Sequence, residues 1–208
     1  MTTARDLLIV SMDVPAADRP VEQGDLSLAL AGAELLDLAA AHALTVDADR
    51  IVPDPMYAPG TLDALGERQL AEAASALTRQ PPYETVEEWL WRRGRGLRAA
   101  YLATMESEGR LIRQRHRFHP LSSGRTVVVD SPDRRRAAER WASGEPVLAA
   151  LAAAVRIQDA AADELARLTS DTIVTVLAAV DEAVTELAGE RQRRTIEDAA
   201  FDNVWRGQ

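Results

Sequence analysis

The sequence predicts a mainly α-helical protein: one compact multi-helix domain with one or two small β-hairpins. Of its 208 residues, 47% are hydrophobic and 27% charged, which is the balance of an ordinary globular chain. Most apolar residues recur at the three- and four-residue spacing of a buried helix face. Only two stretches, near residues 44–52 and 110–130, alternate like strands around a turn, and the second hairpin is expected to project.

The first part of the chain alternates helix signals with turns. Residues 6–12 suit a short strand or the start of a helix. Asp25 can cap a helix that runs to about His42. Residues 44–46 and 51–52 flank a turn and predict the first hairpin. A further helix is expected over Leu62–Leu77, before the Pro81–Pro82 pair stops it.

The middle of the chain has sharper boundaries. Thr85 and Glu88 have the spacing of a capping box, which predicts a helix start. The next helix is expected to reach about Glu108, with Gly109 as its stop. Its buried face should carry Leu97, Tyr101 and Met105. Residues 110–118 and 125–129 then predict the second hairpin.

The last third is expected to be helical throughout. Ser131 and Pro132 have the types favoured at an N-cap and at the first helical position, before a basic helix over 134–141. Alanine-rich helices are predicted over about 146–167, 171–188 and 190–206. No repeat or linker divides the chain, so residues 1–208 are expected to form a single domain.

Composition restricts the class of protein. The chain has no cysteine, which excludes disulfides, thiolate metal sites and cysteine nucleophiles. Its apolar runs are far shorter than the roughly 20 residues of a spanning helix, and no secretion signal is visible. We therefore expect a cytoplasmic protein.

Charge is unevenly distributed along the chain. The formal net charge is −9, and all 24 basic residues are arginine. Residues 92–140 hold thirteen arginines and five acids, a net +8, so the remainder carries −17. A lysine-free, alanine-rich composition is typical of a GC-rich bacterial genome. The alternative is selection for guanidinium groups, which bind phosphate through two parallel hydrogen bonds.

Motifs of catalysis are not visible. Gly94–Ala99 matches a loosened dinucleotide-binding pattern, but a helix rather than a strand precedes it. His116 and His119 would point to opposite faces of a strand, so they would not share a metal ion. No residue suggests itself as a nucleophile or a general acid. We expect no enzyme activity, no metal and no cofactor.

The arginines at 95 and 98 are the best candidates for a ligand site. They lie three residues apart near the start of a helix, whose amides add partial positive charge. Both guanidiniums can therefore hold one phosphate. The alternative is a solvated or salt-bridged basic face. Trp91, beside Arg92 and Arg93, suits either the core or an interface.

Three stretches resemble the Golgi phosphoprotein 3 family. Residues 30–39, LAGAELLDLA, are similar to the family's L-R-G-x-x-L-x-E-L-A helix. Residues 80–90, QPPYETVEEWL, resemble its P-x-T-V-x-x-W-I segment. Residues 95–111 resemble its R-x-x-R helix, which ends in a glycine turn before a hairpin. On these motifs the chain is identified as a bacterial, actinobacterial-type member.

The resemblance implies a predominantly helical fold with a projecting hairpin. The family's eukaryotic members are peripheral membrane proteins, not enzymes; they bind phosphatidylinositol 4-phosphate and adapt cargo enzymes to coat proteins. Their headgroup pocket uses the R-x-x-R pair, which falls at Arg95 and Arg98. It also uses a first-helix arginine, which falls at Ala31, and a tryptophan, which falls near Glu22. Part of that pocket is therefore missing.

The leading hypothesis is a peripheral binding or scaffold protein with an arginine face for anionic lipid headgroups, located at the inner face of the membrane. Arg95 and Arg98 would hold the headgroup phosphate. Two alternatives stay open: a helical module for a protein partner or a homo-oligomer, and nucleic-acid binding through the basic hairpin, which the acidic remainder disfavours. Further candidates for facing the membrane are Trp91, Arg92, Arg93, Arg115, Arg117, Phe118 and Leu121.

Overall fold

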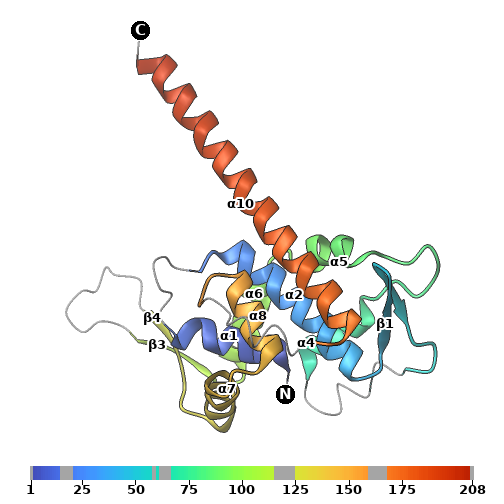
Figure 1. Ribbon diagram of the computed structural model, residues 1–208. Coiled ribbons are helices and arrows are strands. Elements are labelled where there is room, and N and C mark those ends of the chain that lie inside the picture. The colour runs from blue at the N-terminus through green and yellow to red at the C-terminus, as the bar shows by residue number, and fades with distance from the viewer. Residues whose placement is uncertain are drawn as a thin grey trace.

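A computed structural model describes residues 2–14, 21–57, 60, 67–114, 125–158 and 168–206. Within these ranges, eight helices and two antiparallel hairpins form a mainly α-helical fold, as predicted (Figure 1). The helices are α1 (Thr3–Asp13), α2 (Gln23–Ala40), α4 (Arg68–Ser75), α5 (Val86–Arg93), α6 (Leu97–Ser107), α7 (Pro132–Ala142), α8 (Pro146–Ala154) and α10 (Asp171–Arg206). The strands are β1 (Leu44–Asp47), β2 (Arg50–Pro53), β3 (Leu111–Gln114) and β4 (Arg125–Val128).

Helix α2 is the centre of the fold. Helices α1, α4, α5, α6, α8 and α10 all pack against it, and 13 of its 18 residues are buried. A helix that is apolar on almost every side is stable in water only when other elements enclose it. At Gly32 a Cβ atom would lie 2.4 Å from Val180 Cγ2 of α10. Glycine at this position therefore lets α2 and α10 approach closely.

Both predicted hairpins are confirmed. Strands β1 and β2 pair antiparallel, with Val46 opposite Ile51, and β3 pairs with β4, with Ile112 opposite Val127. Helix α6 leads directly into β3, because Gly109 adopts a positive φ of 70° and lets the Arg110 amide donate to the Met105 carbonyl. Residues 115–124 lie outside the described residues.

Two predicted helix starts need correction. Residues 6–12 belong to a helix that begins earlier, because the Thr2 hydroxyl caps it by accepting a hydrogen bond from the Arg5 amide. Helix α2 begins at Gln23, so Asp25 is not its cap but lies in its first turn. Of the helix predicted over Leu62–Leu77, the structure describes α4, and residues 61–66 lie outside the described residues.

The helix predicted over 146–167 is also too long. Helix α8 ends at Ala154, and Arg156 follows with a positive φ of 60°. Residues 159–167 lie outside the described residues. The alanine-rich composition favours a longer helix, but the Ile157 amide donates to the Ala152 carbonyl and closes the helix end locally.

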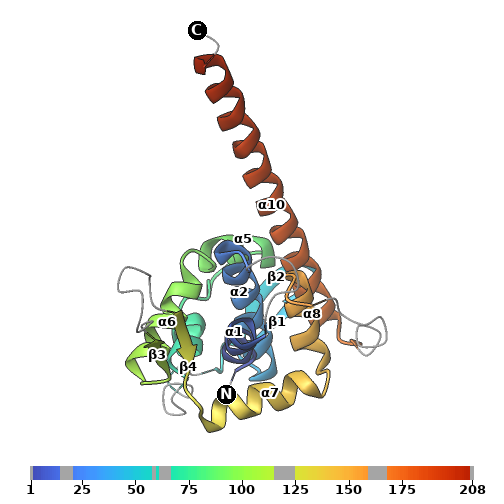
Figure 2. The same ribbon diagram turned by 90° about the vertical axis from the view of Figure 1, so that its left-hand side faces the viewer.

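Helix α10 runs across the body and continues well beyond it (Figures 1 and 2). The prediction of two helices divided at Gly189 is wrong, because α10 is continuous from Asp171 to Arg206. A glycine destabilises a helix by about 1 kcal/mol relative to alanine, but it still forms the backbone hydrogen bonds. The helix-forming residues on both sides of Gly189 outweigh this cost, so the helix continues. The side chains of residues 192–198 are all exposed. In the part of the chain that the structure describes, no helix combines the length and apolarity needed to cross a bilayer.

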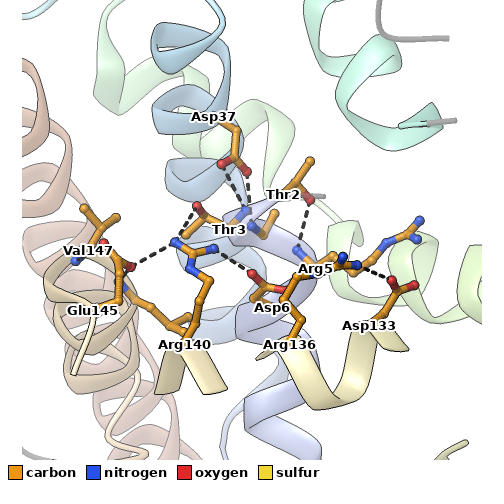
Figure 3. A network of polar contacts seen from close by, with 12 residues as sticks. Thr2, Thr3, Arg5, Asp6, Asp37, Asp133, Arg136, Arg140, Glu145 and Val147 are labelled. Carbon is orange, nitrogen blue, oxygen red and sulfur yellow. Dashed lines mark hydrogen bonds and ion pairs between the residues drawn. The ribbon is translucent and has the colours of Figure 1, made fainter. Parts of the chain in front are cut away.

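The start of α1 is fastened to α2 by one carboxylate (Figure 3). The amides of Thr3 and Ala4 donate to the two oxygens of Asp37, at 2.9 and 3.2 Å. These are amides that a helix leaves without an internal partner, so Asp37 of α2 acts as a cap for α1.

Arg140 fastens the start of α1 to α7 (Figure 3). Its Nη1 donates to Asp6 Oδ2 at 2.6 Å, and its Nη2 donates to Glu145 Oε2 at 2.9 Å. Glu145 in turn caps α8 by accepting from the amides of Val147 and Leu148. One guanidinium thus links the ends of three helices.

The Asp37 cap predicts a pH-dependent stability. Burial raises the pKa of Asp37 from 3.8 to about 6, although the Thr3 and Ala4 amides favour its charged form. Between these two values the folded state holds a proton that the unfolded state has released. Stability therefore falls as pH rises from about 4 to 6, by about 3 kcal/mol from this group.

Urea unfolding of wild type and Asp37→Asn across pH 4–7 checks this prediction. The difference in unfolding free energy between the two should change over that interval and then level off. Burial also raises the pKa of Asp6, which is present in both proteins and cancels in the difference. The pKa of Glu34 is raised by burial and also by the charge of Asp37, so a smaller change in Glu34 titration adds to the difference. Parallel profiles for the two proteins would contradict the assignment.

Candidate functional site

The candidate arginines lie at the corner where α5 ends and α6 begins. The predicted capping box starts α5: the Glu88 amide donates to Thr85 Oγ1 at 3.0 Å, and the Thr85 amide donates to Glu88 Oε2 at 2.8 Å. Gly96 adopts a left-handed φ of 69° as the N-cap of α6. The two glycines around Arg95 therefore form a turn between helices, in agreement with the rejection of a dinucleotide fold.

Among the residues that the structure describes, no carboxylate pairs with the guanidinium of Arg95 or Arg98. Arg95 is exposed and Arg98 is half-buried. The Arg98 amide donates to Ser27 Oγ at 3.2 Å, but its side-chain Nε is buried with no hydrogen-bond partner. An unsatisfied buried donor costs about 1–3 kcal/mol, so an acceptor supplied by a ligand would be favoured here.

Most other arginines are neutralised within the protein. Among arginines whose side chains the structure describes, only Arg79, Arg95, Arg98 and Arg156 form no ion pair. The basic helix α7 is an example, because Arg134 pairs with Asp13 at 2.7 Å and Arg135 pairs with Asp130 at 3.6 Å. Of the nine arginines in residues 92–140 whose side chains are described, seven are therefore salt-bridged, and Arg95 and Arg98 are the two free cations.

These two cations line a pocket of about 290 Å³. Its walls come from three places: the start of α2, the α5–α6 corner and the side chain of Leu187 on α10. The N-cap residues of α2 and α6, Glu22 and Gly96, provide no side-chain cap. Two helix starts and two free guanidiniums therefore contribute positive potential to one hollow. The lining residues are Gln23, Gly24, Ser27, Leu28, Trp91, Gly94, Arg95, Gly96, Arg98, Ala99 and Leu187.

Trp91 and Arg92, at the end of α5, have different surroundings. Trp91 is half-buried and lines the pocket, beside Arg95. Arg92 is bound to Glu84, with its Nε 2.6 Å from Oε1, and its guanidinium carbon lies 5.1 Å from the centre of the Trp89 ring. Of these residues, Trp91 is placed to contact a ligand.

Arg93 is held in the protein interior, which does not fit its predicted place at a membrane surface. Its Nε and Nη2 donate to the two oxygens of Glu34, at 2.7 and 2.9 Å, and the Glu34 side chain is 0% exposed. Burial lowers the pKa of Arg93, but hydrogen bonds and charge from Glu34 outweigh it, so the pKa is raised overall. Arg93 fixes the corner that presents Arg95.

Tyr101 completes this buried group. Its hydroxyl donates to Glu34 Oε1 at 3.1 Å. Burial and the negative charge of Glu34 raise the pKa of Tyr101 well above its usual value, so the hydroxyl stays protonated. The carboxylate of α2 therefore binds both α5 and α6.

The remaining predicted positions contribute less to the site. Ala31 is fully buried, and its carbonyl accepts from the Trp89 indole at 3.1 Å, so this position does not line the pocket. Glu22 is the N-cap residue of α2, next to the pocket-lining Gln23. The hairpin candidates Arg115, Arg117, Phe118 and Leu121 lie outside the described residues.

A larger hollow of about 560 Å³ lies between the end of α2, the first hairpin and the start of α10. Its lining is mostly apolar, with His42 and Asp54 among the polar groups, and no described arginine lines it. Within the described ranges, no three His, Cys, Asp or Glu side chains gather as metal ligands. The α5–α6 corner therefore remains the best-equipped site for an anion.

Comparison with known protein families adds independent information. The model of the family described as Golgi phosphoprotein 3 (GPP34) matches residues 4–199, which is nearly the whole chain. The chain belongs to the Golgi phosphoprotein 3 family. No curated protein matches it. The resemblance inferred from three short motifs is thus confirmed across α1 to α10.

In this Golgi phosphoprotein 3 family member, the site residues predicted from the sequence include three that line the pocket, Trp91, Arg95 and Arg98, and miss most of the others. Gln23, Gly24 and Ser27 carry no motif, and they reach the pocket because α2 starts there. Leu187 of α10 follows Arg98 by 89 residues in the chain. Only the packing of α10 against α2 brings it to the arginines, so no local signal could have identified it.

Proposed function

We propose that this protein binds anionic lipid headgroups as a peripheral binding or scaffold protein, with a phosphate held by Arg95 and Arg98. The observation that carries the proposal is the pair of free guanidiniums in a pocket where two helices, α2 and α6, begin. Charge-assisted hydrogen bonds from arginine to phosphate are about twice as strong as neutral ones. Family membership supports the same class of ligand.

The pocket also suits the rest of a headgroup. Its apolar side is formed by Leu28, Trp91 and Leu187, and its polar side by Gln23, Ser27 and the arginines. In a headgroup whose ring carries a phosphate, the phosphate would lie at the guanidiniums and the ring would pack against Trp91. Trp91 comes from α5, so it would supply an aromatic surface although position 22 carries a glutamate.

Co-flotation with phosphatidylcholine vesicles tests the proposal. One set of vesicles would contain phosphatidylcholine alone. Three further sets would each contain one added anionic lipid: phosphatidylinositol, cardiolipin or phosphatidylinositol 4-phosphate. We expect wild type to float with anionic vesicles, and Arg95→Ala/Arg98→Ala to bind at least about tenfold more weakly. Arg79→Ala/Arg156→Ala is the matched control, because it removes two exposed, unpaired arginines that do not line the pocket.

Soluble inositol 1,4-bisphosphate added as a competitor distinguishes headgroup recognition from attraction to a charged surface. Competition is expected for wild type if the pocket holds the headgroup. The proposal fails if wild type stays with the non-floating fraction in every mixture at low salt. It also fails if the control variant loses as much binding as the site variant.

A protein-interaction role has one observation in its favour. Residues 192–198 of α10 are exposed beyond the body, and Ile196 is 60% exposed. An isolated helical stretch of this length is marginal in water, so a partner would stabilise it. Light scattering over a concentration series is the measurement for self-association.

A further inference from the structure

Helix α10 leaves the body at the pocket of Arg95 and Arg98. Leu187 lines that pocket, and a Cβ atom at Gly24 of α2 would lie 2.7 Å from Leu187 Cδ2. The Leu187 side chain therefore packs directly on the backbone of Gly24. Arg191 is the last partly buried side chain described on α10, since residues 192–198 are all exposed.

An ion pair closes this contact. Both Arg191 Nη atoms donate to the carboxylate of Asp25, and Nη1 lies 3.3 Å from Oδ2. The Asp25 side chain is only 12% exposed, so it depends on this guanidinium for neutralisation. Asp25 directly follows Gly24 in the first turn of α2, which forms one wall of the pocket.

The sign of the charge at this turn matters for an anion. Without Arg191, a poorly solvated carboxylate would lie beside a pocket that must accept a phosphate, with Glu22 nearby on the same turn. The repulsion between this carboxylate and the phosphate opposes binding, and it is stronger where water is partly excluded. The carboxylate could also attract the free guanidiniums of Arg95 and Arg98.

We propose that docked α10 completes the anion pocket: Leu187 forms a wall by packing on Gly24, and Arg191 is a positioning residue that neutralises Asp25. The proposal rests on the anion-binding function above and concerns its regulation. An anion in the pocket and the docking of α10 then stabilise each other, because linkage between two equilibria is reciprocal. Anything that releases the end of α10 weakens anion binding.

Vesicle binding of four variants tests this, with phosphatidylcholine vesicles containing phosphatidylinositol 4-phosphate as the probe. Arg191→Ala should weaken binding about five- to tenfold, because Asp25 is left unpaired. Asp25→Asn should bind like wild type. The double variant Asp25→Asn/Arg191→Ala should return to within about twofold of Asp25→Asn. Arg194→Ala is the control, since it removes an exposed arginine that pairs with Glu190 of its own helix.

Hydrogen exchange supplies a second measurement. The amides of residues 184–192 should exchange more slowly in wild type when the vesicles are present, and faster in Arg191→Ala without them. If Arg191→Ala binds as tightly as wild type, the coupling is overturned and anion binding stands. If it binds weakly and Asp25→Asn does not restore binding, Arg191 acts on the ligand directly and its action through Asp25 is overturned. If wild type itself does not bind, both proposals fail.

Discussion

Replacing Arg93 by alanine is expected to destabilise the protein by about 3–5 kcal/mol. The substitution leaves Glu34 as an unpaired carboxylate in the core, with the Tyr101 hydroxyl as its remaining side-chain donor. Desolvation of an isolated charge is costly, and its pKa must rise before the fold can accommodate it. Urea unfolding at neutral pH measures the loss.

Two further variants separate the loss of the ion pair from the loss of a side chain. Arg68→Ala removes an exposed arginine that pairs with Glu72 one turn along α4, and it should cost less than about 0.5 kcal/mol. Glu34→Leu/Arg93→Leu removes both charges and should be less destabilised than Arg93→Ala. A loss below about 1 kcal/mol for Arg93→Ala would show that Glu34 finds another partner or a proton easily.

Replacing Trp89 by alanine is expected to cost about 3–5 kcal/mol as well. The Trp89 side chain is fully buried between α5 and α2, and its indole donates to the Ala31 carbonyl at 3.1 Å. Truncation opens a cavity at the base of the corner that carries Arg95, and it removes the hydrogen bond that the indole adds to the helical bond of the Ala31 carbonyl. The free energy of unfolding and the midpoint of thermal unfolding should both fall.

Trp89→Phe keeps an aromatic ring and removes the donor together with part of the ring volume. It should cost about 1–3 kcal/mol, less than alanine. Equal losses for the two variants would mean that ring packing contributes little at this position. Neither substitution touches the pocket lining, so any loss of vesicle binding should follow the fraction of unfolded protein.

Local sequence signals predicted many features of the fold correctly. The capping box at Thr85, the proline-initiated helix after Ser131 and the buried Leu97–Tyr101–Met105 face all appear as expected. Each depends on residues within two turns of one another, so their types and spacing are sufficient. The family resemblance was also readable, because its motifs are short and contiguous.

Other features depend on contacts between distant segments. The Asp37 cap of α1 joins residues more than 30 positions apart, and the ion pair between Asp25 and Arg191 joins residues 166 apart. The continuity of α10 through Gly189 is a related case, because a glycine makes a helix end more favourable without requiring one. Sequence spacing does not distinguish these outcomes.

For this protein, the sequence alone determined the helical class, most element starts and the two arginines at 95 and 98. It could not determine which arginines are free, since every guanidinium has the same local chemistry and its partner is chosen by packing. The tertiary structure decided that Arg93 is buried against Glu34, whereas Arg95 and Arg98 face a pocket. It also decided that α10 forms a wall of that pocket, because burial of the apolar face of α10 against α2 brings Leu187 and Arg191 to the start of α2.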